Sequence, residues 1–260
     1  MTVPDILRRI TDQRRRRLGS STPPPLPEAE ATSLCGGPFL EALTAARGRA
    51  VVAEVKMGSP KLGDLRSRVD PKAQARLYAE NGAAALSVVV EPDFFHGSYE
   101  LLAQCKGASG LPTIAKDFLV HPAQLDEARR AGADAVLLIA ALHDRETLAA
   151  WAGAARSHGL VPLIETHARA DLAKLAGRSW ELVGINNRDL RTFEVDLGQS
   201  IERVGELPAG CLKVAESGIR DREDLERLAA AGFDAFLIGE SLLLAEDPAA
   251  ALRGLTHPGE

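Results

Sequence analysis

Metal-binding and disulfide patterns are absent from this sequence of 260 residues. Its three cysteines, Cys35, Cys105 and Cys211, lie far apart and are odd in number, so neither a disulfide framework nor a zinc-binding pair is indicated. The six histidines form no H-x-x-x-H pattern and no cluster with cysteine, and we interpret them as helix caps or surface residues. Unpaired cysteines are typical of a reducing compartment. We therefore expect a cytoplasmic protein that holds no metal ion.

Long apolar runs and nucleotide-binding motifs are also missing. No apolar run approaches the roughly 20 residues of a membrane-spanning helix, and the polar, basic start of the chain does not resemble a secretory signal. No G-x-G-x-x-G or Walker motif follows a predicted strand, so no cofactor is indicated. The net charge of −5 argues against nucleic-acid or membrane partners. The one basic run, Arg14 to Arg17, is expected to form the solvated face of a helix.

Short apolar runs that alternate with amphipathic helical segments fill most of the chain. Eight such runs predict strands at 50–55, 84–90, 112–115, 134–139, 160–164, 181–185, 211–215 and 234–238. Helical patterns follow at 71–80, 98–106, 122–131, 144–157, 168–176, 197–204, 221–231 and 247–255. Because strands alternate with helices, the sequence predicts βα units and a parallel sheet.

A helical extension precedes these units. An amphipathic pattern predicts a helix over residues 3–18, and a second helix is predicted over 38–48 with Gly48 as its C-terminal cap. The proline-rich segment 21–30 between them cannot form a regular helix and predicts an extended linker. We divide the chain into an extension, 1–48, and a barrel, 49–260, within one structural domain.

Weak internal repetition favours a closed barrel. The segments NGAAALSVVV, AGADAVLLIA and AGFDAFLIGE each place a glycine after a helix and before a strand. Gly82, Gly132 and Gly232 can adopt the left-handed conformation that ends a helix. Eight βα units with this repetition predict an α/β fold of the (β/α)8 TIM-barrel class, and an open doubly wound sheet is the alternative.

Charged and polar residues fall at the C-terminal ends of the predicted strands, where barrel active sites lie. Glu54 and Lys56 end the first strand, and their spacing places both side chains on one face. Charged groups are rarely buried unless they are paired, so several at one rim predict shifted pKa values and acid–base chemistry. The other strand ends carry Glu91, Lys116, Glu165, Asn186, Asn187, Arg188, Glu216 and Ser217.

Small residues follow the seventh and eighth strands. Gly218 comes after Ser217, and Gly239 opens a short extra helix. Backbone N–H groups at this pair of loops form the common phosphate site of barrels, which predicts a phosphorylated small-molecule substrate.

Seven segments carry a more specific signal, and in chain order they are AEVKMGSP, EPDFFHGSYELL, IAKDFLVHPAQLDEARRAGADAVLLI, LIETH, GINNRDL, VAESGI and LIGESLL. Together, from about residue 37 to 250, they resemble the indole-3-glycerol phosphate synthase family. The resemblance implies a TIM barrel with an N-terminal helical extension. It implies a lyase of tryptophan biosynthesis that converts 1-(2-carboxyphenylamino)-1-deoxyribulose 5-phosphate to indole-3-glycerol phosphate, with loss of carbon dioxide and water and without a cofactor. We expect a monomer or a weak homo-oligomer.

The resemblance also implies roles for single residues. Lys116 would be the general acid that protonates the ribulose carbonyl, and Glu165 would be its partner acid/base in dehydration. Lys56 would contact the substrate's charged groups, with Glu54 and Asn186 orienting it and a substrate hydroxyl. Further pocket residues would be Glu216, Ser217, Arg188, Phe94, Phe95, Phe118 and Leu138, with Ile139 beside it. The phosphate would be held by Lys56, Ser59, Gly218, Gly239 and the amide of Glu240.

Some residues depart from the family's pattern. Met57 replaces the usual second basic residue after Lys56, and Lys61 replaces a serine shortly after Ser59. We expect these changes in the first strand's loop to alter rate and affinity rather than reaction type. Val90 stands where the family more often has threonine, and we expect it to remove a hydroxyl from the rim. A divergent copy with a specialised role is the alternative.

Two other functional classes compete with this interpretation. A Schiff-base aldolase also uses a barrel and an interior lysine, but it needs a lysine whose pKa is lowered. Carboxylates beside the lysine would raise that pKa. A barrel that serves only as a binding or scaffold module is expected to have lost its polar rim, and this rim is intact.

Overall fold

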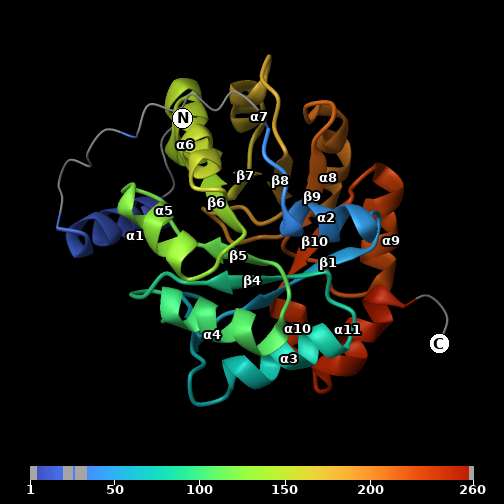
Figure 1. Cartoon of the computed structure of the whole chain (residues 1–260). Helices are drawn as coiled ribbons and strands as arrows, with labels where there is room; N and C mark the ends of the chain where they lie inside the picture. Colours follow the sequence, from blue (N-terminus) through green and yellow to red (C-terminus); the bar gives the residue numbers. More distant parts are fainter. Residues whose placement is uncertain (1–4, 20–25, 27–33, 258–260) are drawn as a thin grey trace.

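A closed parallel barrel forms the centre of the molecule (Figure 1). The structure is a computed structural model that describes residues 5–19, 26 and 34–257. The barrel strands are β1 (Ala50–Val55), β4 (Ala85–Val89), β5 (Thr113–Lys116), β6 (Ala135–Ile139), β7 (Val161–Thr166), β8 (Leu182–Asn186), β9 (Leu212–Glu216) and β10 (Ala235–Ile238). Because β1 pairs in parallel with both β4 and β10, the sheet has no edge. This confirms the predicted TIM barrel and excludes the alternative, an open doubly wound sheet.

Helices connect successive strands and cover the outside of the barrel (Figure 1). They are α3 (Pro71–Glu80), α4 (Tyr99–Ser109), α5 (Ala123–Arg130), α6 (Arg145–Ser157), α7 (Arg169–Leu175), α8 (Leu197–Arg203), α9 (Arg222–Ala231), α10 (Glu240–Leu244) and α11 (Pro248–Thr256). Two 3-10 turns, Ala140–Leu142 and Val204–Glu206, follow β6 and α8. As the sequence predicts, Gly82, Gly132 and Gly232 have positive φ after α3, α5 and α9.

The strands divide the core into two layers. Successive strand side chains point to opposite faces, so Ala50 and Val52 face the barrel interior while Val51 and Val55 pack toward the helices. The same alternation places Glu54 inside the barrel. The interior layer continues through Ile114, Leu137, Leu163, Val214 and Leu237. Strand parity therefore decides which residues at each strand end can reach the mouth.

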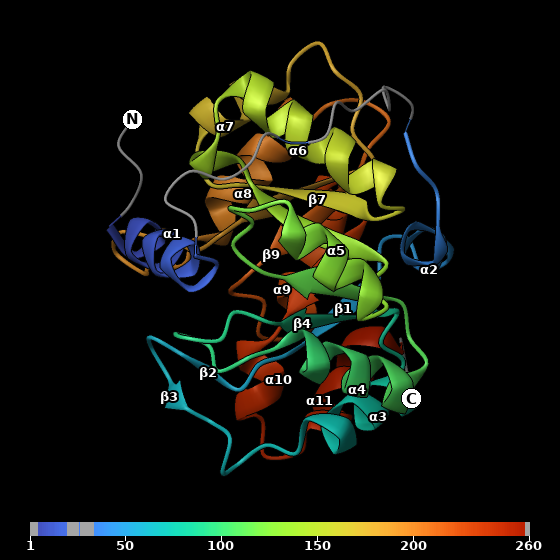
Figure 2. The same ribbon diagram turned by 60° about the vertical axis from the view of Figure 1, so that its left-hand side comes forward.

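The two helices of the extension lie on opposite sides of the barrel (Figure 2). Helix α2 (Pro38–Ala45) packs Phe39 and Leu43 into the interior layer, where they close the N-terminal end. Helix α1 (Asp5–Arg17) lies on the side of the short hairpin of β2 (Gly58–Ser59) and β3 (Gly63–Asp64). The sequence pattern did not predict this hairpin.

The extension requires one correction. The helix predicted over 38–48 ends at Ala45, and Gly48 is not its cap. Gly48 instead lies in the turn before β1, where its N–H donates to the carbonyl of Asp234 at 2.8 Å. Except for Leu26, the predicted linker at 21–30 lies outside the described residues. Within the described ranges, no helix has the length and apolar character needed to cross a membrane.

Candidate functional site

A cavity of about 790 Å³ opens at the C-terminal ends of the barrel strands. Strand ends and loops that are far apart in the sequence contribute to its wall. Of the residues that the sequence predicts for a site, the wall contains Glu54, Lys56, Ser59, Phe95, Lys116, Phe118, Glu165, Asn186, Arg188, Ser217, Gly218, Gly239 and Glu240. The polar rim therefore encloses one space large enough for a phosphorylated small molecule.

Glu54 is the centre of the charged network in this cavity. One carboxylate oxygen lies 3.1 Å from Nζ of Lys56, and the other lies 3.2 Å from Nζ of Lys116. Burial alone would raise the pKa of Glu54, but the two ammonium groups lower it to about 2. Burial alone would lower the pKa of Lys116, and the nearby carboxylates, Glu54 first, raise it above its ordinary value. Lys116 is therefore protonated at neutral pH.

Glu216 belongs to the same network, and its pKa is shifted in the opposite direction to that of Glu54. Its side chain is fully buried, and Oε2 accepts from Nζ of Lys116 at 3.5 Å, whereas Oε1 has no hydrogen-bond partner. Burial and the neighbouring carboxylate of Glu165 raise the pKa of Glu216 well above its ordinary value, against the opposing effect of Lys116. Room for this carboxyl depends on Gly184, where a Cβ would lie 2.2 Å from Oε1. The site thus contains one carboxyl group with a lowered pKa, Glu54, and one with a raised pKa, Glu216.

Glu216→Gln is expected to raise the free energy of unfolding above that of wild type, by an amount that grows as the pH rises. Unfolded Glu216 ionises near pH 4.5, but folded Glu216 keeps its proton to higher pH. Folding then takes up a proton, so stability falls by about 1.4 kcal/mol per pH unit above pH 4.5 until the folded pKa is reached. Glutamine removes this slope, because its amide is neutral in both states. Urea-unfolding midpoints at pH 5 and pH 8 measure the effect, and equal pH slopes in both proteins would contradict it.

His167 lies beside the site, against Glu165, and the sequence analysis missed this contact. We expected histidines to be caps or surface residues, but the His167 side chain is only 12% exposed and Nε2 lies 3.2 Å from Oε1 of Glu165. The contact lacks hydrogen-bond geometry, since neither ring nitrogen has a hydrogen-bond partner. The available signal was the two-residue spacing after Glu165, which repeats the spacing of Glu54 and Lys56.

In the loops after β9 and β10, small residues leave backbone groups uncovered at the cavity. Ser217 and Gly218 have φ angles of 66° and 80°, and a Cβ at Gly218 would lie 2.1 Å from Cγ1 of Val195. A Cβ at Gly239 would lie 2.5 Å from Oε1 of Glu54. Larger side chains would therefore have to displace these neighbours. Backbone N–H groups exposed in a turn can bind anions.

Glu240 links two loops across the mouth. Its carboxylate accepts from Nη2 of Arg188, in the loop after β8, at 2.9 Å, and it also pairs with Lys61 of the β2–β3 hairpin. Burial alone would raise the pKa of Glu240, and the pairs with Lys61 and Arg188 lower it below its ordinary value. Lys61, which the sequence analysis noted as a departure from the family's pattern, thus supplies an ion pair at the wall of the cavity.

Strand parity excludes some of the predicted residues from the cavity. Leu138 does not line it, because it faces the helices while Leu137 and Ile139 face the interior. Val90 also packs toward the helices at 1% exposure, so the expected effect on a rim hydroxyl is wrong.

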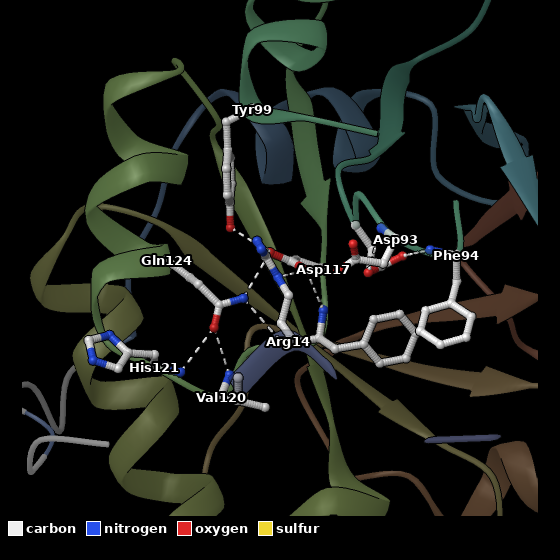
Figure 3. Close-up of polar contacts among 10 residues, drawn as sticks. Arg14, Asp93, Phe94, Tyr99, Asp117, Val120, His121 and Gln124 are labelled. Carbon is white, nitrogen blue, oxygen red and sulfur yellow. Dashed lines mark hydrogen bonds and ion pairs between the residues drawn. The ribbon is translucent and has the colours of Figure 1, made fainter. Parts of the chain in front are cut away.

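The loop after β4 gives a second correction. Phe94 does not line the cavity, and its N–H donates to Oε2 of Glu91 at 2.7 Å (Figure 3). Glu91 is itself fully buried and accepts from three backbone N–H groups, so it fixes this loop and does not add to the charged rim. Phe95 and Phe118 form the aromatic part of the wall, with ring centroids 6.0 Å apart.

Helix α1 also contributes to the cavity, a point on which the sequence analysis made no prediction. Ile6, Leu7 and Ile10 line it. The basic run at the end of this helix is only partly a solvated face. Arg14 is 4% exposed and forms an ion pair of 2.6 Å with Asp117 (Figure 3).

Within the described part of the chain, no group of three or more histidine, cysteine or acidic side chains could hold a metal ion.

Comparison with known proteins identifies the family of this chain. The family model described as "Indole-3-glycerol phosphate synthase" matches residues 7–255. A protein named indole-3-glycerol phosphate synthase from Rhizorhabdus wittichii is 43% identical over 216 residues, which cover 83% of this chain and 82% of that protein. A protein of the same name from Albidiferax ferrireducens is 41% identical over 258 residues, or 96% of this chain and 98% of that protein.

Among solved structures, a ligand complex of KGPDC from Streptococcus mutans matches with a TM-score of 0.59. It is 12% identical, and the match covers 79% of this chain and 95% of that one. At this identity the likeness supports the barrel fold alone.

Proposed function

Because the chain belongs to the indole-3-glycerol phosphate synthase family, we propose that its cavity binds 1-(2-carboxyphenylamino)-1-deoxyribulose 5-phosphate and closes the indole ring there. The enzyme is a carboxy-lyase of tryptophan biosynthesis, and its product is indole-3-glycerol phosphate. The observation that carries the assignment of the site is the half-buried, protonated Lys116 among Glu54, Glu165 and Glu216.

Ring closure needs an acid at the ketone oxygen. The aromatic carbon that bears the carboxylate attacks the ribulose carbonyl carbon, and Lys116 gives a proton to the carbonyl oxygen as the new bond forms. A raised pKa keeps Lys116 protonated for this step, and the ammonium also stabilises the charge that develops on the oxygen. Carbon dioxide then leaves, and its bonding electron pair returns to the ring.

Dehydration completes the indole. The new hydroxyl leaves as water after it takes up a proton, and a second proton is removed from the neighbouring carbon. We assign Glu165 as the acid/base of this step, because it lines the cavity close to the Lys116 network. The aromatic pair Phe95 and Phe118, together with Leu137 and Ile139, would hold the anthranilate ring and exclude water.

The phosphate would bind at the loops after β9 and β10. Gly218 and Gly239 leave the backbone accessible there, and Lys56 and Ser59 lie on the same wall. Arg188 is paired with Glu240. Arg188 would therefore bind a charged group of the substrate only if that group replaced Glu240 as its partner.

The proposed function is tested by the reaction itself. Wild-type protein incubated with the aminodeoxyribulose phosphate is expected to produce the fluorescence of an indole, together with one carbon dioxide per product. Absence of both signals under conditions where the protein is folded would contradict the proposal.

The Schiff-base aldolase gives a different chemical outcome. An aldolase lysine must be unprotonated to attack a carbonyl, whereas the pKa of Lys116 is raised. Borohydride is therefore expected to trap no covalent adduct with the ketose phosphate, as judged by the mass of the intact protein. A mass increase located at Lys116 would support the aldolase instead. A cytoplasmic location and a monomeric or weakly associating state stay predictions.

A further inference from the structure

We propose that Phe193 is a substrate-contacting residue, and that its ring covers the bound substrate on the solvent side of the cavity. The inference rests on the proposed function for the identity of the substrate. Phe193 lies in the loop 187–196 between β8 and α8, and its side chain lines the cavity. The sequence analysis gave this residue no role.

The backbone of Phe193 is strained. Its φ angle is 61°, in the left-handed region that a bulky side chain rarely adopts. Among the residues that the structure describes, only three other than glycine have a positive φ, and the remaining two are His96 and Ser217. All three lie in loops at the C-terminal ends of strands. Strained backbone of this kind concentrates at functional sites, where the surrounding structure holds a side chain in a fixed position.

The Phe193 side chain also has a large exposed fraction for an aromatic residue, 43%. Val195 and Leu244 are 40% and 53% exposed, and all three residues line the cavity. In the described part of the chain, Leu34 is the one further large hydrophobic residue that is exposed, and it does not line the cavity. The exposed large hydrophobic side chains are therefore concentrated where a ligand can cover them.

Backbone hydrogen bonds shape the turn that carries Phe193, which comprises residues 188–195. The N–H of Phe193 donates to the carbonyl of Asp189 at 2.8 Å, and the N–H of Asp189 donates to the carbonyl of Glu194 at 2.9 Å. The Asp189 carboxylate accepts from the N–H groups of Arg191 and Thr192 at 2.6 and 3.2 Å. None of these bonds uses the phenylalanine ring. Glycine would fit the same turn with less strain, so the turn itself does not explain the ring.

The 188–195 turn is anchored on two sides. Arg188 and Val195 pair across it, and Val195 packs so closely on Gly218 that a Cβ at Gly218 would lie 2.1 Å from Cγ1 of Val195. Gly218 belongs to the loop that is proposed to bind the phosphate. Leu190, at the other side of the turn, packs against the interior layer of the barrel. These contacts fix the position of Phe193 at the cavity wall.

A ring at this position has two physical effects on a bound substrate. Because nearly half of the side chain is exposed, covering it with substrate removes apolar surface from water and favours binding by about tenfold. The ring also keeps water from the reacting groups, which strengthens the interaction of the Lys116 ammonium with the ketone oxygen. The proton transfers themselves stay with Lys116 and Glu165.

Phe193→Ala and Phe193→Gly are the first test. Both remove the ring, so both are expected to raise KM about tenfold and to leave kcat within about threefold of wild type. Alanine keeps the strain at a φ of 61°, whereas glycine relieves it, so Phe193→Gly is expected to melt about 2–4 °C above Phe193→Ala. Phe193→Tyr keeps the ring and is expected to have a KM near that of wild type. Initial rates of indole formation and scanning calorimetry measure these effects.

Leu34→Ala is the matched control. Leu34 has a similar exposed fraction, 47%, and does not line the cavity, so its truncation is expected to leave KM unchanged. An unchanged KM in both Phe193→Ala and Phe193→Gly would overturn the proposal. A melting temperature of Phe193→Gly more than about 5 °C below that of wild type would also overturn it, because the ring would then hold the fold rather than the substrate.

Fluorine NMR of protein labelled with 4-fluorophenylalanine gives a direct measurement. The chain contains seven phenylalanines, and Phe193→Leu identifies the resonance of Phe193 by its loss. A soluble gadolinium chelate is expected to broaden this resonance in the free protein, since the ring is exposed. Saturating indole-3-glycerol phosphate is expected to protect it from the chelate.

The resonance of Phe118, identified with Phe118→Leu, separates this inference from the proposed function. Phe118 belongs to the aromatic wall, so product that binds in the cavity is expected to shift its resonance. A shift at Phe118 without protection of Phe193 would overturn the inference and leave the proposed function standing. No response at either ring would show that the product does not bind, which would contradict the proposed function and the role of Phe193 together.

Discussion

Lys116→Met is expected to lower kcat by about a thousandfold, within the range that positioned acid–base groups contribute. Methionine fills a similar apolar volume but can neither donate a proton nor stabilise negative charge on the ketone oxygen. Glu54 keeps Lys56 as a partner 3.1 Å away, so the variant is expected to fold. Lys116 donates to Glu54 and Glu216 and not to the loops of Gly218 and Gly239, where the phosphate is proposed to bind. Initial rates of indole formation measure the effect.

The control for this variant separates binding from chemistry. Retention of inorganic phosphate or product binding, followed by isothermal titration, would show that the phosphate end is intact. A kcat near that of wild type would show that the proton comes from another group. An equal loss in kcat and in phosphate affinity would show that Lys116 maintains the site as a whole, which the proposed role does not predict.

Glu54→Gln is expected to lower both stability and activity. The folded pKa of about 2, against 4.5 for an ordinary glutamate, means that ionised Glu54 favours folding. At pH 7 this contribution is about 3 kcal/mol. Glutamine leaves Lys56 and Lys116 as two half-buried ammonium groups without their shared counterion. The pKa of Lys116 is then expected to fall, which shifts the alkaline limit of kcat/KM to lower pH.

The pH dependence identifies the cause of the stability loss. The contribution of Glu54 is fully present above pH 4.5 and is lost as the pH falls through the folded pKa of about 2. The stability difference between wild type and Glu54→Gln should therefore shrink to about half or less at pH 3. Urea unfolding followed by fluorescence of the buried Trp151 and Trp180 measures it. Exposed Glu100→Gln is the control, and a pH-independent difference would contradict the electrostatic explanation.

The strand ends were the most predictable part of the site. Glu54, Lys56, Lys116 and Glu165 could be named because a parallel barrel brings every strand's C-terminal end to one mouth, and because alternation determines which side chains face inward. The same rule, applied strictly, would have replaced Leu138 by its neighbours Leu137 and Ile139.

Loops and paired charges were less predictable. The role of Glu91 in fixing its own loop depends on backbone N–H groups that local turns orient toward it, and no periodic pattern reports this. Arg14 belongs to a run of four arginines, and composition gave no reason to separate it from the other three. Its partner lies 103 residues away.

The order of apolar runs and their period were enough to predict the barrel, and the residues that end the runs predicted a polar mouth, because these depend on local rules repeated eight times. The reaction itself was indicated by the resemblance of seven segments to a known family. Only the tertiary structure decided which charged groups lie together, which carboxyl has a raised pKa and how the first helix joins the wall. These properties depend on distances and solvent exclusion between segments that are remote in sequence, and a linear pattern does not contain those quantities.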